Sequence, residues 1–337
     1  MLAALGDRVV GISTIQMGGA QPGLMSAADQ AKAASPDCIL TVGGGAQQDA
    51  GKLLRLYLAA PPHTGGATPE SICAASASPA PLVPQICIPN SFAMAELTSV
   101  AGMTLSSGVK SGAAHPSLMP TVVLLDRGLM ETLPDWVRFG TALRCVEHAV
   151  GAATHPNATE AIVEAALIGL GEAKRGIEMM AAGQAGGGGG EVDTYVGGWR
   201  AVRALNTSGC YPALGHLIGN MYSARFDVHQ GACSGIMCAR IVAWQVAGSG
   251  SMIGGRIAEA LGGTSDEHPA KLISDLAAMC PGVVREHQEA GVDIDALREC
   301  VGGWNLDRLN GLTSNTFKDL EDVFGVLTKP LGELCGA

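Results

Sequence analysis

The sequence predicts two domains of different class: a mainly parallel α/β domain at the N-terminus and an all-helical domain at the C-terminus. Short apolar runs, separated by helical segments and Gly-rich turns, continue to about residue 130, and this alternation is typical of a parallel sheet. After Leu133 and Pro134 the β-branched runs end, and apolar residues recur with the 3.6-residue period of helices. We therefore expect the α/β domain to span residues 1–136 and the helical domain to span residues 137–337.

The α/β domain is expected to contain four short strands. Continuous apolar runs bounded by turn residues are typical of buried parallel strands. The strands are expected at residues 8–13, 38–42, 86–89 and 122–125, and helices are expected at residues 24–35 and 50–58. Residues 60–80 are rich in Pro, Ala, Gly and Ser, so we expect a loop there.

The C-terminal domain is predicted from helical spacing alone. Helices are expected at residues 138–152, 157–182, 197–206, 231–248, 251–261, 269–280 and 294–301. The low-complexity stretch GQAGGGGG at residues 183–190 interrupts this pattern. Because Gly-rich stretches of this kind are flexible linkers, we interpret it as a connector and not as a phosphate-binding loop.

The charge balance excludes two broad classes of partner. The chain has 31 acidic and 21 basic residues, a net charge of −10, and no run of basic residues. Nucleic acids and anionic membranes require a basic footprint, so neither is expected as a partner. None of the ten cysteines forms a Cys-x-x-Cys pair, and scattered, buried thiols are typical of a reducing compartment. With no signal-peptide pattern and no apolar stretch long enough to span a membrane, a cytoplasmic protein is expected.

The first motif that suggests chemistry follows the predicted strand at residues 38–42. Gly43, Gly44 and Gly45 precede a helix that contains Asp49 and Lys52. Glycines allow the backbone to approach a phosphate closely, and the start of a helix attracts anions. The pattern is neither a Walker A motif nor a Gly-x-Gly-x-x-Gly motif. A pyrophosphate-binding turn and an ordinary tight turn therefore both remain possible from spacing alone.

The second motif, IPNSFAMAELT at residues 88–98, follows the next strand. Asn90 and Ser91 form a polar turn, and Glu96 and Thr98 could line a cleft. The same residues would also suit the solvated start of a helix. Spacing alone does not separate these two interpretations.

The third group consists of an Arg and three His in the helical half. Arg144 and His148 are four residues apart, so they share one helix face, whereas Glu147 is rotated away. His216 and His229 follow on elements that could fold back and supply acid–base groups or metal ligands. A single His on a helix more often has a structural role. Three imidazoles together suggest a catalytic centre, although the pattern is not specific for one.

In order and spacing, these motifs resemble the iron-containing alcohol dehydrogenase family, nearest to its maleylacetate reductase branch. That family has a Gly-Gly-Gly-Ser turn followed by Asp and Lys, a Thr-Thr turn after the next strand, a helix with a His-Ala-Val/Ile-Glu signature, and then Gly-His-x-x-Gly and His-Gly. The matching positions here are residues 43–52, 88–104, 120–126 with 133–134, 148–151, 215–219 and 229–231. The resemblance covers residues 8 to about 325, with Ala46 in place of Ser and Gly151 in place of Glu.

The resemblance implies a dehydroquinate synthase-like fold, in which an active-site cleft separates a dinucleotide-binding-type domain from the helical domain. It implies NADH or NADPH as the cofactor. The implied cofactor-binding residues are Gly43, Gly44, Gly45, Asp49, Asn90 and Ser91, and the implied catalytic residues are Arg144, His148, His216 and His229. The family has a strand, a helix and a strand before the region that matches residues 8–13. The α/β domain is therefore expected to lack its first strand–helix unit and part of the nucleotide site.

Arg144 is the most informative departure from the family pattern. Metal-binding members have an Asp four residues before the first His, at the position of Arg144. A guanidinium is permanently charged and cannot ligate a cation, so we expect no tightly bound iron or zinc. Arg144 and His148 could instead clamp a carboxylate or polarise a carbonyl group. Alternatively, Arg144 could be held by the neighbouring Glu147 or by another residue of the domain.

Two functions follow as hypotheses. The first is an NAD(P)H-dependent, metal-independent reductase of a small, carboxylated carbonyl compound such as an oxo acid, in which Arg144 and a His stabilise the alkoxide or deliver the proton. The second is a redox-silent relative that catalyses an isomerisation, cyclisation or elimination by His and Arg acid–base chemistry in the same cleft. A homodimer is the expected assembly.

Overall fold

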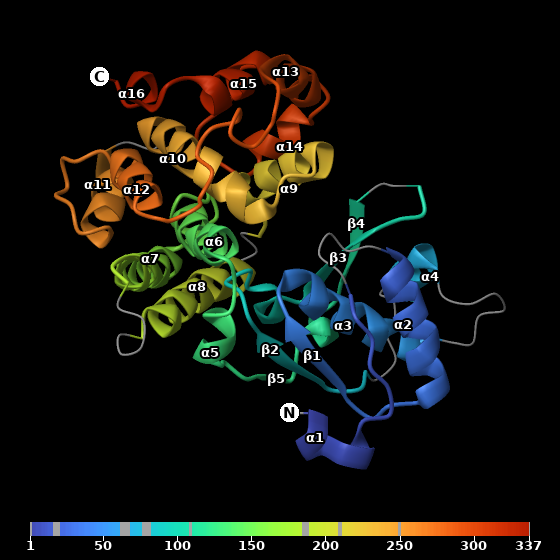
Figure 1. Cartoon of the computed structure of the whole chain (residues 1–337). Helices are drawn as coiled ribbons and strands as arrows, with labels where there is room; N and C mark the ends of the chain where they lie inside the picture. The colour runs from blue at the N-terminus through green and yellow to red at the C-terminus, as the bar shows by residue number, and fades with distance from the viewer. Residues whose placement is uncertain are drawn as a thin grey trace. The chain divides into compact units, whose positions relative to one another are not determined.

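The computed structural model describes residues 2–15, 21–60, 68–75, 82–107, 110–183, 189–207, 211–248 and 251–336. The chain divides into two compact units, Met1–Met130 and Glu131–Ala337. The first unit contains the strands and the second is built from helices, so the predicted fold class is confirmed (Figure 1). The observed division after Met130 lies close to the boundary after residue 136 that the sequence predicted.

The N-terminal unit is built on a three-stranded parallel sheet of order β1-β2-β5. The strands are β1 (Ile39–Gly43), β2 (Gln85–Pro89) and β5 (Val122–Val123). Helix α3 (Gly45–Ala59) packs on β1 and β2, and α2 (Gln21–Ala34) packs against α3 (Figure 1). Leu53 and Leu56 of α3 are each 1% exposed, because apolar residues three apart face the sheet together. The predicted strand–turn–helix at residues 38–58 is thus confirmed.

The strand predicted at residues 8–13 is wrong. A 3-10 helix (Gly6–Arg8) ends there, and residues 9–15 have no regular structure. Val10 and Ile12 are 59% and 63% exposed. A β-branched run becomes a strand only where a neighbouring strand and a buried face are available to it. In the part of the chain that the structure describes, this run pairs with neither edge of the sheet.

The loop predicted at residues 60–80 also needs correction. It contains helix α4 (Pro69–Ala74), which begins at a capping box formed by Thr68 and Ser71. The two side chains satisfy each other's backbone N–H groups, a signal that outweighs the loop-like composition. Residues 61–67 and 76–81 lie outside the described residues.

An antiparallel hairpin that the sequence did not predict follows β2. It consists of β3 (Val100–Thr104) and β4 (Lys110–Ala114). Its strands are rich in Ala and Gly, so they lack the alternation of large apolar and polar residues that identifies a strand. A Cβ atom on Gly112 would lie 2.7 Å from the carbonyl oxygen of Ala101, so the two strands approach closely at this position.

The helical unit is organised around α6, which packs against four other helices. Almost every residue of α6 from Val137 to Ala153 is buried, including the charged Arg144 and Glu147, because neighbouring helices pack around it. Helices α7, α8, α9 and α10 surround it (Figure 1). The longer helices are α6 (Asp135–Ala153), α7 (Glu160–Ala181), α8 (Gly190–Thr207), α9 (Leu214–Phe226), α10 (Gln230–Gly248), α11 (Ser251–Ala260), α12 (Pro269–Ala278), α13 (Ile294–Gly302) and α15 (Leu320–Thr328).

All seven helices predicted in this half of the chain are present, with ends that differ by a few residues. Helices α9 and α15 and the short helices α14 (Leu306–Asn310) and α16 (Leu331–Leu334) were not predicted. Of the low-complexity stretch at residues 183–190, residues 184–188 lie outside the described residues. No helix in the described part of the chain has both the length and the apolar character that a membrane crossing requires.

Glycines explain how the central helices approach one another so closely. A Cβ atom on Gly169 of α7 would lie 2.6 Å from the carbonyl oxygen of Gly197 in α8. A Cβ atom on Gly231 of α10 would lie 2.7 Å from the carbonyl carbon of Gly140 in α6. Both positions therefore require Gly, and the second contact brings the start of α10 against the face of α6 that carries Arg144.

Candidate functional site

The Gly-rich turn of the N-terminal unit has the geometry of a phosphate-binding turn. Gly43 has a φ of +141°, a conformation that residues with a side chain rarely adopt. Gly44 precedes α3, and its helix start has no side-chain cap. The first N–H groups of a helix have no partner within the helix and are available to an anion. These residues therefore fit a phosphate group.

Asn90 and Ser91, which the resemblance placed near the cofactor, lie beside this turn. The backbone N–H of Asn90 donates to the carbonyl oxygen of Gly43 at 3.1 Å. A Cβ atom on Gly44 would lie 3.1 Å from the Ser91 hydroxyl oxygen and 3.8 Å from the Asn90 side-chain oxygen. A Cβ atom on Gly45 would lie 3.2 Å from the Cβ of Ala93. The absence of side chains on the glycines thus keeps the turn compact against the loop that follows β2.

Asp49, expected at a pyrophosphate, has a structural role in the structure. One carboxylate oxygen accepts from Lys52 Nζ at 3.1 Å, and the other accepts from the backbone N–H of Gly102 in β3 at 2.9 Å. Lys52 also donates to Thr98 and to the carbonyl oxygens of Ala95 and Val100. The pair therefore holds the β3–β4 hairpin against α3.

The centre of the helical unit is Arg144 of α6, which is 2% exposed. Its Nη2 lies 2.9 Å from His216 Nδ1, and its Nη1 donates to the carbonyl oxygen of Gln230 at 3.5 Å. Its Nε is buried and has no hydrogen-bond partner among the described residues. Within the described residues, no carboxylate forms an ion pair with Arg144. Glu147 does not hold Arg144, because its carboxylate accepts from Ser234 of α10 at 2.5 Å instead. Arg144 is held by other residues of the domain, His216 and Gln230, which was the other part of that alternative.

The Arg144 contact determines which nitrogen of His216 carries the proton. An Arg can only donate hydrogen bonds, so His216 Nδ1 accepts and the proton of the neutral ring lies on Nε2. Burial, with Arg144 and His148 nearby, lowers the pKa of His216 well below its usual value, which keeps the ring neutral. His216 Nε2 lies 2.9 Å from the hydroxyl oxygen of Tyr211. His216 therefore donates to Tyr211.

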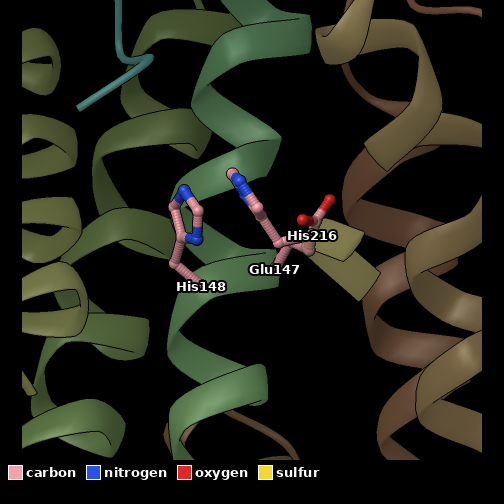
Figure 2. A group of neighbouring side chains, drawn as sticks. All are labelled: Glu147, His148 and His216. Carbon is pink, nitrogen blue, oxygen red and sulfur yellow. The ribbon is translucent and has the colours of Figure 1, made fainter. Parts of the chain in front are cut away.

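His148 lies beside His216, with ring centroids 5.1 Å apart. His148 is 2% exposed, and its Nδ1 has no hydrogen-bond partner in the part of the chain that the structure describes. Burial, and secondarily Arg144, lowers the pKa of His148 to about 3. Figure 2 shows His148 and Glu147 projecting from α6 and His216 reaching the same region from α9. The structure thus brings Arg144, His148 and His216 together, as the sequence predicted.

Glu147, His148 and His216 have the spacing of a metal site but not its electrostatics. One potential ligand atom of each lies within 4.8 Å of the others. The Nδ1 lone pair of His216 already accepts from Arg144, and Nε2 carries a proton. Arg144 adds a fixed positive charge beside both imidazoles. In this arrangement the residues do not fit a divalent cation.

His229 lies at the edge of this group. It directly precedes α10, and its Nδ1 accepts from the backbone N–H of Gly231 at 3.1 Å. The ring packs edge-on against Trp136 at 5.2 Å between centroids. Burial, and then the charge of Arg144, lowers the pKa of His229. Among the described residues it makes no hydrogen bond to Arg144, His148 or His216, so it caps a helix within the electrostatic reach of Arg144.

Tyr211 and Ser234 are the site residues that the sequence analysis missed. Tyr211 precedes α9 and follows residues 208–210, which lie outside the described residues. Its spacing of five residues from His216 matches no catalytic motif. Ser234 lies one turn after His229 in α10, where its hydroxyl meets Glu147 of α6. Only the packing of α6, α9 and α10 against one another shows that these residues belong to the site.

Comparison with known proteins agrees with this description. The model of the iron-containing alcohol dehydrogenase family matches residues 2–127. Over 121 residues the chain is 30% identical to a maleylacetate reductase from Rhizobium sp. (strain MTP-10005). That match covers 36% of this chain and 28% of the relative. The sequence match therefore spans less than a third of the length of this curated relative.

Solved structures extend the likeness of fold to nearly the whole chain. A maleylacetate reductase from Agrobacterium tumefaciens is similar with a TM-score of 0.70, covering 94% of this chain and 80% of that one at 21% identity. An NADH-dependent butanol dehydrogenase A from Thermotoga maritima is similar with a TM-score of 0.72, covering 93% and 80% at 18% identity. The resemblance to the iron-containing alcohol dehydrogenase family, including its maleylacetate reductases, is thereby confirmed.

Proposed function

We propose that this chain is an NAD(P)H-dependent reductase of a small, carboxylated carbonyl compound and that it works without a tightly bound metal. The observation that carries this proposal is the isolated charge of Arg144. The guanidinium is 2% exposed and has no ion-pair partner among the described residues. The similarity to alcohol dehydrogenases and maleylacetate reductases supports the reaction class.

A buried, unpaired guanidinium favours an anionic ligand. Burying an ion in a protein interior without a partner of opposite charge costs on the order of several kcal/mol. A substrate carboxylate would offset that penalty in the bound state, and planar guanidinium groups suit carboxylates. An oxygen that gains negative charge as a carbonyl is reduced would offset it in the transition state. Arg144 therefore supports an oxo acid as the substrate.

The N-terminal unit supports the nucleotide part of the proposal. The Gly43–Gly45 turn and the uncapped start of α3 fit a phosphate, and Asn90 and Ser91 lie beside the turn. When bound, a reduced nicotinamide would supply the hydride. The backbone N–H groups of this turn would hold and orient the nucleotide, which can be either NADH or NADPH.

We propose that no metal is required because of two features: the positive charge of Arg144 and the neutral, Nε2-protonated form of His216 beside it. Arg144 places a permanent positive charge beside His148 and His216, where a metal ion would otherwise act. Both functions of a metal here, attracting an anion and polarising a carbonyl oxygen, are ones that a fixed guanidinium can perform. We therefore propose that Arg144 takes the electrostatic place of a metal. A homodimer remains our expected assembly.

The test is a binding titration of NADH and NADPH, followed by nicotinamide fluorescence, in protein treated with a chelator and in protein supplied with Fe(II) or Zn(II). Saturable binding in the chelated protein is expected, followed by NAD(P)H oxidation with a panel of oxo acids at a rate that added metal does not raise. A rate that depends on added metal would contradict the proposal that the enzyme works without a tightly bound metal. No nucleotide binding by a protein that melts cooperatively would overturn the reductase.

The redox-silent alternative keeps one specific observation in its favour. Glu147 Oε1 and His148 Nδ1 are both buried and have no hydrogen-bond partner among the residues that the structure describes. An isomerase or lyase needs two groups that can exchange protons with a substrate. Turnover of an oxo acid without nucleotide, followed by NMR of the substrate protons in deuterated water, would identify this activity. Strict dependence on NAD(P)H would exclude it.

A further inference from the structure

We propose that the helical unit has a second ligand site, a cavity that binds a small molecule with an apolar body and one carboxylate group. The cavity has a volume of about 420 Å³, which lies within the range of small-molecule sites, roughly 300–1,000 Å³. Its walls come from α6, α10, α12, the segment 285–289 and the start of α16 (Figure 1). This inference concerns binding alone and does not rest on the proposed reductase function.

The cavity is separate from the site around Arg144. The predicted catalytic residues are not among the described residues that line it. Leu143 and Val146 of α6 do line it, and on a helix these positions point to a different face from Arg144. Ser234 of α10 lines the cavity as well, and its hydroxyl donates to Glu147. This hydrogen bond between α6 and α10 therefore forms the boundary between the two sites.

A glycine of α10 brings the charged rim of the cavity into place. A Cβ atom on Gly235 would lie 2.4 Å from the carbonyl oxygen of Val284, so only Gly allows this segment to approach α10 so closely. The turn that follows is fixed by Glu289, whose carboxylate accepts from the backbone N–H groups of Arg285 and Glu286 at 2.9 Å and 3.3 Å. The fold thus holds Arg285 and Glu286 at the edge of the cavity.

The charged groups of the cavity differ in how firmly they are held. The Arg240 side chain is 10% exposed, and it donates to three backbone carbonyl groups and, at 2.7 Å, to the Glu286 carboxylate. The Glu286 side chain is 59% exposed, and Glu289 is exposed as well. The charge fixed in the wall is therefore positive, whereas both carboxylates lie at the rim, where water screens them.

Arg285 provides hydrogen-bond donors that the protein does not use. Within the part of the chain that the structure describes, only its backbone atoms form hydrogen bonds, and its guanidinium has no ion pair. A guanidinium can donate two parallel hydrogen bonds to a carboxylate. A ligand carboxylate at the rim would contact Arg285 and feel the charge of Arg240, while its apolar body would pack on Ala239 and Leu331. A cationic ligand would face both guanidinium groups.

The test begins with calorimetric titrations of the full chain with four matched probes. Octanoate has both the apolar body and the charge, octanamide has the body alone, octylammonium has the opposite charge, and acetate has the charge alone. Octanoate should bind about fivefold more tightly than octanamide, because of its charged contact with Arg285, and more tightly still than octylammonium. Acetate should bind most weakly, because it buries little apolar surface. Octanamide or octylammonium binding as tightly as octanoate would overturn the proposal.

A fifth probe distinguishes two natural sources of such an acid. 3-Phenylpropanoate carries the same carboxylate on an aromatic body. Tighter binding of octanoate would indicate an acid derived from a lipid, and tighter binding of 3-phenylpropanoate would indicate an aromatic acid. Either order supports the proposal, provided that the amide of the same body binds more weakly. Failure of both acids to bind would overturn it.

Two rim variants should change the affinity for octanoate in opposite directions. Arg285→Met should raise the Kd about fivefold, because the charged contact is lost, and it should leave the Kd for octanamide unchanged. Glu286→Gln should lower the Kd about threefold, because its amide oxygen can still accept from Arg240 but no longer repels the ligand. Arg308→Met removes an exposed Arg of α14 that does not line the cavity, so this control should change neither Kd. Changes of the same sign in both rim variants would contradict the proposal.

Methyl NMR and one further variant locate the bound acid. Octanoate should shift the methyl signals of Ile273 and Leu331, which line the cavity, and leave that of Ile177 in α7 unchanged. Arg144→Met should bind octanoate as the wild type does. Binding that is lost in Arg144→Met and retained in Arg285→Met would place the carboxylate at the other site and overturn the proposal. Because no nucleotide takes part, these results stand or fall separately from the reductase.

Discussion

The most deeply buried cation of the first unit is Lys52 and that of the second unit is Arg144, and the two have different surroundings. Lys52 is 0% exposed, and its ammonium group has four oxygen partners, one of which is the Asp49 carboxylate. Arg144 is 2% exposed, and among the described residues its guanidinium forms hydrogen bonds only with a neutral imidazole and a backbone carbonyl. Within the same residues, Arg144 Nε, Glu147 Oε1 and His148 Nδ1 have no hydrogen-bond partner.

The difference separates a structural charge from a functional one. A fully paired and hydrogen-bonded cation stabilises the fold that surrounds it, and removing it leaves its partners unsatisfied. An unpaired buried cation contributes no comparable stability, so its presence is better explained by a task outside folding. By this criterion Lys52 holds the β3–β4 hairpin to α3, whereas Arg144 is available to a ligand.

The largest effect on folding is expected for Lys52→Met. Among the described residues it removes the only cation that pairs with Asp49, and it takes one donor from each of three further oxygens, so the free energy of unfolding should fall by about 3 kcal/mol. Urea denaturation followed by circular dichroism measures this change. Lys174→Met, which removes a surface pair with Glu178, is the control and should change the free energy by less than about 0.5 kcal/mol. Equal effects would contradict the structural role of Lys52.

The opposite outcome is expected for Arg144→Met. Because the charge is buried and unpaired, an apolar side chain of similar length should leave the free energy of unfolding unchanged or raise it by up to about 2 kcal/mol. The same urea titration tests this. A loss as large as that of Lys52→Met would show that Arg144 stabilises the fold, and it would remove the distinction between the two cations.

The neutral histidines around Arg144 predict a pH dependence of stability. His148 has a pKa of about 3 in the folded protein, below the usual value of 6.5. Below pH 6.5 the unfolded chain binds a proton that the folded chain does not, so stability is lost as the pH falls from 6.5 toward 3. His148→Asn should reduce this slope by up to about 1.4 kcal/mol per pH unit. Identical slopes in urea titrations between pH 6.5 and 4.5 would contradict the shift.

The smallest effect is expected at the Gly-rich turn. In Gly44→Ala the added methyl group would meet the Ser91 hydroxyl at 3.1 Å, so the turn must shift and a phosphate can approach less closely. The Kd for NADH or NADPH should rise about fivefold, or about 1 kcal/mol. Gly302→Ala, at a position where an added Cβ meets nothing within 4 Å, is the control for fluorescence titrations. An unchanged Kd in Gly44→Ala would mean that the nucleotide does not approach this turn.

The sequence predicted those parts of the fold that depend on local pattern. The strand, Gly turn and helix at residues 38–58 and the helix that carries Arg144 and His148 were correct, because their apolar spacing and glycines act within one segment. The hairpin of β3 and β4 was missed because Ala and Gly carry no alternating pattern. The run at residues 8–13 has strand composition but no pairing strand among the described residues.

The sequence predicted which residues belong to the candidate site better than it predicted the contacts between them. Spacing placed Arg144 and His148 on one helix face, but it also allowed Arg144 to pair with Glu147. The outcome depended on α9 and α10, which bring His216 to Arg144 and Ser234 to Glu147. Tyr211 precedes α9 and carries no motif, so only the hydrogen bond to His216 identifies it. Tertiary packing, which periodicity does not encode, decided each of these contacts.

The most direct test of the account is the preference for an anionic substrate in the wild type and in Arg144→Met. For the best oxo acid and its methyl ester, the ratio of kcat/KM values should be about 10²–10³ in the wild type, the range expected when one buried charge contacts a carboxylate or a developing oxyanion. In Arg144→Met the ratio should fall close to one, with unchanged nucleotide affinity. A preference for the acid that survives in Arg144→Met would show that the unpaired guanidinium does not select the substrate, and it would contradict the central claim.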